Sequence, residues 1–266
     1  MERRTAGALI GILVVVCAGL GFAVAYPFTT SDPHAAAPPS EQFTVGDGAA
    51  YTATGRIVVD GDVRLAFDGV VTADGAWYQR VEEPNVTSEA YRAGPTEPVY
   101  QRLTITGQDR AERRRERIRE DEDTRLHRER RDGDRVTFVV ERPADSDTEP
   151  VSGTASVFVT SLSVVSYRTT ASGSPGSTVH EPRSGWYDGR RTYRITGASG
   201  EVDADAETHA VRSANVSWEL TDPAGTYAEY VLTSGTSDDP TTHRVMIEFD
   251  RGETDVERPS WVEEPG

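Results

Sequence analysis

The side chains that most often carry out chemistry in proteins are scattered along this 266-residue chain. The five histidines stand at positions 34, 127, 180, 209 and 243, and none belongs to an H-x-x-x-H or H-E-x-x-H motif that would bind zinc from one helix. The chain has neither a G-x-S-x-G nucleophile motif nor a phosphate-binding P-loop. We therefore expect no catalytic residue, metal site or cofactor. A hydrolytic enzyme is the least favoured interpretation.

Acidic side chains do come close together in the sequence. Glu201, Asp203 and Asp205 alternate along one segment and would offer the oxygen ligands that a hard cation prefers. The chain has 44 acidic residues against 28 basic ones, so such groupings arise from composition alone. A solvated acidic loop is the favoured interpretation.

The only two asparagines both lie in N-x-S/T sequons. These are Asn85-Val86-Thr87 and Asn215-Val216-Ser217. The pattern is the acceptor motif for N-glycosylation of exported proteins. We predict that Asn85 and Asn215 carry glycans.

Export is also indicated by the first 26 residues. Residues 1–5 contain Arg3 and Arg4, and residues 6–26 are uncharged and mostly apolar, long enough as a helix to span a ~30 Å hydrocarbon core. A retained anchor would leave the N-terminus in the cytoplasm and place the rest of this single-pass protein outside the membrane. Alternatively, the A-x-A pattern Ala23-Val24-Ala25 would direct cleavage after Ala25 and secretion. Cys17 is the only cysteine, so the exported part has no disulfide.

The charge of the chain indicates the solvent in which it works. All basic residues are arginine, and without Glu2, Arg3 and Arg4 the exported part has 26 basic and 43 acidic residues, a net charge of −17. Such self-repulsion destabilises a compact state in dilute buffer, but molar salt screens it within ~3 Å. The composition resembles that of proteins from extreme halophiles. We interpret the acidity as adaptation to brine rather than as a docking surface for a basic partner.

Residues 109–131 combine ten arginines with eight acids. Opposite charges recur at i,i+3 and i,i+4, as in Glu112–Arg115 and Arg125–Glu129, which predicts an exposed helix. The interleaved acids would repel phosphates, and high salt weakens binding to nucleic acids. A nucleic-acid partner is therefore not expected.

The rest of the chain predicts a β-rich domain. Residues 27–42 form a Pro/Ala/Ser-rich linker, and residues 43–266 form one extracytoplasmic domain. Apolar and polar residues alternate in about nine segments, which predicts strands with one buried face. These segments are 51–59, 63–68, 76–82, 99–105, 136–140, 193–195, 210–220, 228–232 and 245–249. Asp-Gly pairs that favour hairpin turns stand at 60–61, 68–69, 74–75, 132–133 and 188–189.

Residues 151–168 have apolar residues at helical spacing, including Phe158, Leu162 and Val165, although their β-branched content leaves a strand open. A sheet of nine or more strands tends to curl, and its apolar face needs a cover. The predicted fold is therefore mainly β with α (α+β). It is a curved antiparallel meander sheet, a half-barrel, covered by one or two helices and preceded by an N-terminal transmembrane helix.

Three segments resemble the LolA/LppX-like lipoprotein carriers: the hairpin sequence YDGRRTYRITG at 187–197, the closing meander over 211–249, and a final strand at 255–259. The resemblance implies an exported half-barrel whose apolar cavity binds a lipid or a lipoprotein anchor. Phe158, Leu162 and Val165 would line that cavity opposite Trp218 and Tyr230. The alternative is a cell-surface scaffold or sensor domain whose hollow is filled by Trp77, Trp186 and Trp218.

Overall fold

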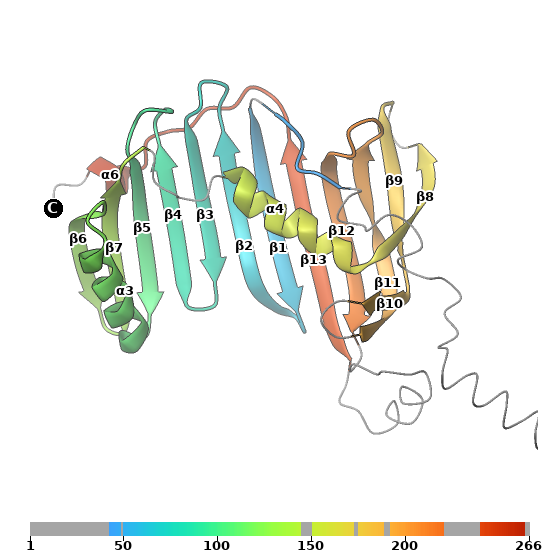
Figure 1. Ribbon diagram of the computed structural model, residues 1–266, viewed down its shortest axis with the longest axis horizontal. Helices are drawn as coiled ribbons and strands as arrows, with labels where there is room; N and C mark the ends of the chain where they lie inside the picture. Colours follow the sequence, from blue (N-terminus) through green and yellow to red (C-terminus); the bar gives the residue numbers. More distant parts are fainter. Residues whose placement is uncertain are drawn as a thin grey trace, which may run out of the picture.

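One curved, open antiparallel sheet forms the body of the protein (Figure 1). The computed structural model describes residues 43–48, 50–144, 151–172, 175–188, 192–220 and 240–263. In this part of the chain the strand order is β6-β7-β5-β4-β3-β2-β1-β13-β12-β11-β9-β8, with β10 paired to β11. The predicted mainly-β architecture is confirmed.

The first five strands form a simple meander. They are β1 Tyr51–Val59, β2 Asp62–Val71, β3 Trp77–Glu83, β4 Val86–Arg92 and β5 Val99–Thr106. Asp60 and Gly61 join β1 to β2 with φ angles of 52° and 84°. Two consecutive left-handed residues are what a type I′ hairpin turn requires, which explains the Asp-Gly pair there.

The later strands extend this meander at both sides. They are β6 Arg125–Asp132, β7 Arg135–Arg142, β8 Ser166–Ser172, β9 Ser177–Arg183, β10 Gly185–Asp188, β11 Thr192–Asp205, β12 Val211–Leu220 and β13 Thr241–Asp250. Strand β7 lies between β5 and β6, which leaves β6 at an edge. The last strand, β13, pairs antiparallel with β1 and thereby joins the two halves of the sheet. The topology is therefore a central meander with strands added at both sides, and the strand order ends at β6 on one side and at β8 on the other.

Two helices cover the same face of this sheet. Helix α3 (Gln108–Glu120) packs on β5 and β7, and α4 (Val151–Ser161), continued by a 3₁₀ turn at Leu162–Val164, crosses β2, β1 and β13 (Figure 1). On β5, Val99 contacts the cluster under α4, while Leu103 and Ile105 contact the cluster under α3. Since Val99, Leu103 and Ile105 alternate along one strand, they point to one face. A short third helix, α6 (Ser260–Glu263), follows the last strand.

The alternation that predicted strands also identifies the buried side chains. Tyr51, Ala53 and Phe67 are buried on the covered face, as are Val245, Ile247 and Phe249. The structure adds β4, β6, β8, β9 and β10, whose sequences alternate less clearly. The predicted strand at 228–232 lies outside the described residues. The helix predicted within 151–168 is confirmed over 151–164, and the chain then enters β8.

The prediction of one helix over 109–131 is wrong in its second half. Helix α3 ends because Asp121 accepts hydrogen bonds from the backbone N–H of Asp123 (3.2 Å) and the hydroxyl of Thr124 (2.6 Å). These bonds stabilise a turn that competes with the next helical turn. Residues 125–132 then form β6, so Glu129 pairs with Arg115 across elements instead of with Arg125.

Two smaller predictions are also corrected. Asp68-Gly69 lies inside β2 rather than in a turn, and residues 251–259 form no strand. The latter segment is held by other contacts, including a hydrogen bond from the Thr254 hydroxyl to the carbonyl of Val71 (2.7 Å). The predicted anchor at 6–26 and linker at 27–42 lie outside the described residues. Among the described helices, none has the length and apolar character that crossing a membrane requires.

Candidate functional site

The residues predicted to line an apolar cavity lie between α4 and the sheet. Phe158, Leu162 and Val165 have no exposed surface, and Trp218 is buried in the same cluster. Three of them come from α4, its 3₁₀ extension and the residue after it, and Trp218 comes from β12 on the same face of the sheet. The structure thus brings these four residues into one core. Tyr230 lies outside the described residues.

Two glycines show how closely α4 approaches the sheet. A Cβ atom on Gly55 of β1 would lie 2.8 Å from the Phe158 ring, and one on Gly69 of β2 would lie 2.5 Å from Val151. Glycine in a strand often marks such a close approach. At these two positions the helix and the sheet are in van der Waals contact, with no room for even a methyl group.

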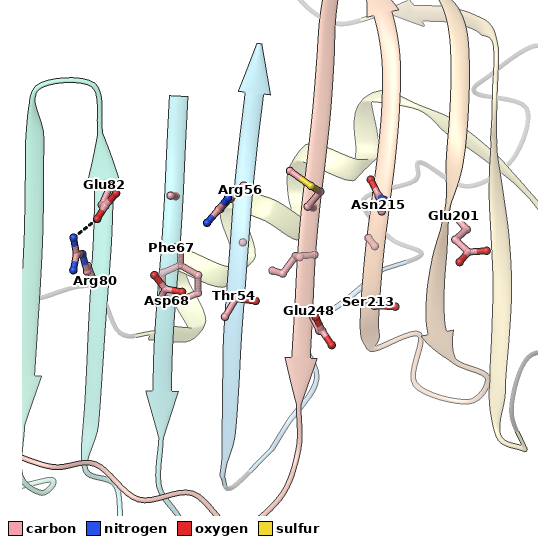
Figure 2. A pocket seen from close by; sticks show the side chains of 15 residues that line it. Thr54, Arg56, Phe67, Asp68, Arg80, Glu82, Glu201, Ser213, Asn215 and Glu248 are labelled. Carbon is pink, nitrogen blue, oxygen red and sulfur yellow. Dashed lines mark ion pairs between the residues drawn. The ribbon is translucent and has the colours of Figure 1, made fainter. Parts of the chain in front are cut away.

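The opposite face of the sheet is not covered by α3 or α4, and it carries a hollow of about 820 Å³. Figure 2 shows this face, with α4 behind the strands. Side chains from six strands, β3, β2, β1, β13, β12 and β11, point into the hollow. The ionisable ones are Arg56, Asp68, Arg80, Glu82, Glu201 and Glu248. Four acids against two arginines make this first hollow acidic.

A second hollow, of about 660 Å³, adjoins the first on the same face and shares Arg80 with it. In the strand register Arg80 stands opposite Glu89, and Glu89 opposite Arg102, so these three side chains point to one face. The charged lining residues are Arg80, Arg102, Arg128, Arg130 and Arg135 with Glu83 and Glu89. The second hollow is therefore basic, although the whole chain has a net charge of −16.

A buried carboxylate organises one side of the second hollow. Glu89 is 7% exposed, and it accepts hydrogen bonds from the Tyr78 hydroxyl (3.0 Å) and from Nε of Arg102 (2.5 Å). Burial, followed by the charge of Glu89, raises the pKa of Tyr78 to about 12. Arg102 also lies over the ring of Trp261 on α6, 5.3 Å from its centre. These contacts fix Arg102 on the uncovered face.

Both predicted glycosylation sites are exposed on the uncovered side of the sheet. Asn85 lies in the turn between β3 and β4, on the rim of the second hollow. Asn215 lies on β12 in the first hollow, where Nε of Arg244 donates a hydrogen bond to its Oδ1 (2.9 Å). The structure is compatible with modification at both positions.

The histidines and the acidic loop do not form a metal site within the described residues. His243 stacks on Trp218, with ring centres 5.7 Å apart and planes inclined by 7°. The His243 ring therefore lies beside the core, and its burial there lowers its pKa. Of the three acids at 201–205, Asp205 caps its own turn, accepting hydrogen bonds from the backbone of Glu207 and Thr208, and pairs with Arg212.

The sequence did not reveal the basic hollow. Its arginines come from β3, β5, β6 and β7, whereas the sequence predicts that those at 128 and 130 lie on an exposed helix. The Asp132-Gly133 turn signal was a clue, because a hairpin there requires strands on both sides. No family model, curated protein or solved structure that was compared with the chain matches it.

Proposed function

We propose that the protein is an extracytoplasmic surface scaffold or binding domain whose apolar face is filled by its own side chains. The N-terminal apolar segment would attach the domain to the membrane, and the uncovered face of the sheet would meet its partners. The observation that carries this proposal is the packing of α4: Phe158 touches the backbone at Gly55, and Val151 touches it at Gly69.

The positions of the two hollows support the same proposal. A pocket for an apolar ligand is usually 300–1,000 Å³ in volume and lined mostly by apolar and aromatic side chains. The two hollows reach that size, but charged and hydroxyl side chains line them on the face away from α4. Such linings suit a polar partner better than a lipid.

Extraction and stability measurements on one set of variants test the proposal. Organic extraction of protein purified in brine should release no stoichiometric lipid. Leu162→Ala should lower the free energy of unfolding by about 2–5 kcal/mol, because Leu162 is fully buried in a packed core. Val157→Ala is the matched control on α4, since Val157 is 45% exposed and its truncation should have little effect.

Binding of a lipid or a lipoprotein anchor is the second candidate function. It is favoured by apolar side chains that border the α4 cluster without being fully buried, among them Leu65, Val81 and Val164. Recovery of about one lipid per protein, together with a stability of Leu162→Ala close to that of Val157→Ala, would favour this function over the scaffold.

A further inference from the structure

The basic hollow contains positive charge that the protein itself does not neutralise. Arg80 pairs with Glu82, and Arg102 pairs with the buried Glu89. Arg130 and Arg135 are exposed, and within the described part of the chain neither forms an ion pair or a side-chain hydrogen bond. Asp132 stands opposite Arg135 in the strand register, but within the described part of the chain no ion pair joins their side chains.

The geometry of the strands places these two arginines side by side. Arg130 on β6 stands opposite Thr137 on β7, two residues from Arg135, so both arginines point to the uncovered face on neighbouring strands. On the other side of β7, Thr106 of β5 stands opposite Arg135. Two residues along the same strands, Thr104 stands opposite Thr137, and their hydroxyls lie 3.2 Å apart. Two guanidinium groups and several hydroxyls therefore surround one part of the hollow.

Protection of the sheet edge does not explain the pair. Charged side chains on an edge strand prevent unwanted pairing with other chains, and this role suits the arginines of β6. Arg135, however, lies on β7, which has β5 on one side and β6 on the other. Its charge contributes to the hollow rather than to the edge.

We propose that the basic hollow binds an acidic polypeptide segment through carboxylates held by Arg130 and Arg135. Guanidinium and carboxylate groups match in geometry and form paired, charge-assisted hydrogen bonds. High salt screens long-range attraction, so binding depends on the short-range paired hydrogen bonds, and the lining suits carboxylates because it has five arginines against two glutamates. None of the described residues that line the hollow is aromatic, so they offer no platform for the stacking that single-stranded nucleic acids require. The inference rests on the proposed function only because both place the partner on the uncovered face of the sheet.

Titration of a fluorescent hexaglutamate peptide tests the inference on the full chain. Fluorescence anisotropy is measured at the lowest salt concentration at which circular dichroism shows an intact fold. The double variant Arg130→Gln/Arg135→Gln should bind the peptide about tenfold or more weakly than the unchanged protein. The matched control is Arg64→Gln/Arg168→Gln, which removes two exposed arginines that do not line the hollow. It should bind as the unchanged protein does.

Three results would overturn the inference. The first is an equal loss of binding in both double variants, which would indicate attraction to charge in general. The second is binding of dextran sulfate or oligothymidine without binding of hexaglutamate, which would indicate another class of polymer. The third is no binding of hexaglutamate by the folded protein. Lipid extraction tests the opposite face of the sheet, so failure of this inference is separate from failure of the filled-core proposal.

Discussion

Gly55 on β1 and Phe158 on α4 touch so closely that a Cβ atom added to Gly55 would lie 2.8 Å from Cε1 of Phe158. Real Cβ atoms essentially never come within 3.0 Å of a heavy atom in a residue that is not their neighbour in the chain. The helix therefore rests on bare strand backbone, and the ring of Phe158 occupies the space that a side chain at position 55 would need. This contact shows that the covered face of the sheet is packed tightly where the middle of α4 crosses it.

Gly55→Ala should destabilise the protein by about 1–3 kcal/mol, because overpacking forces the Phe158 ring or α4 to shift. The midpoint of thermal unfolding in brine measures the effect. Gly252→Ala is the control, since a Cβ atom there would meet no atom within 4 Å. Equal midpoints for the two variants would show that α4 is mobile enough to leave an unfilled space.

The domain should need salt to fold. Without Glu2, Arg3 and Arg4 the chain has a net charge of −17, and its single cysteine leaves no disulfide within the chain to oppose the repulsion. Far-UV circular dichroism during dialysis from ~3 M to ~0.1 M salt should show loss of the strand signal, because the Debye length grows from under 3 Å to ~10 Å. A spectrum that does not change would refute the interpretation of the acidity as adaptation to brine.

Stability should fall when the pH is lowered through the range in which free histidine titrates. Burial is the main reason that the pKa of His243 lies below 6.5, so on acidification the unfolded chain binds a proton at this position before the folded one does. The stability that the neutral His243 ring contributes is fully present above about pH 6.5, and it is lost as the pH falls through the folded-state pKa of His243. His243→Phe, which can keep the stack on Trp218, should reduce this loss of stability in thermal unfolding from about pH 7 to about pH 5.

Burial also lowers the pKa of His180, so the stability of the His243→Phe variant should still depend on pH to some extent. Identical pH profiles for the variant and the unchanged protein would contradict the assignment to His243.

Asn215 should carry a glycan that extends from the first hollow. Arginine has only donors, so Nε of Arg244 must face Oδ1 of Asn215, which leaves Nδ2, the atom that carries an N-glycan, without that contact. Mass spectrometry of peptides from protein made in its natural host should find a glycan at Asn215 and another at Asn85. Asn215→Gln and Asn85→Gln should each remove one of them. An unmodified Asn215 peptide would contradict this prediction and would leave the first hollow without a glycan.

Much of the sheet could be predicted because its residues alternate between a covered face and a solvated one. The pattern around Tyr51, Ala53 and Phe67 determined both the strands and the buried side chains. Helix α4 could also be predicted, because Phe158 and Leu162 repeat at the spacing of a helix. The segment 125–132 could not, because its arginines and acids alternate without an apolar face. Its pairing with β7 determined that it is a strand.

By itself, the sequence determined the alternation, the turn at Asp60-Gly61, the charge balance and the two sequons, because each depends on residues that are close in the chain. Only the tertiary structure decided that Gly55 meets Phe158, about a hundred residues away in the sequence, and that the covered face is packed there. Only the register of β5, β7 and β6 placed Arg130 and Arg135 in one hollow with Arg102. Contacts between strands depend on pairing and curvature of the whole sheet, and no local pattern of residues determines these.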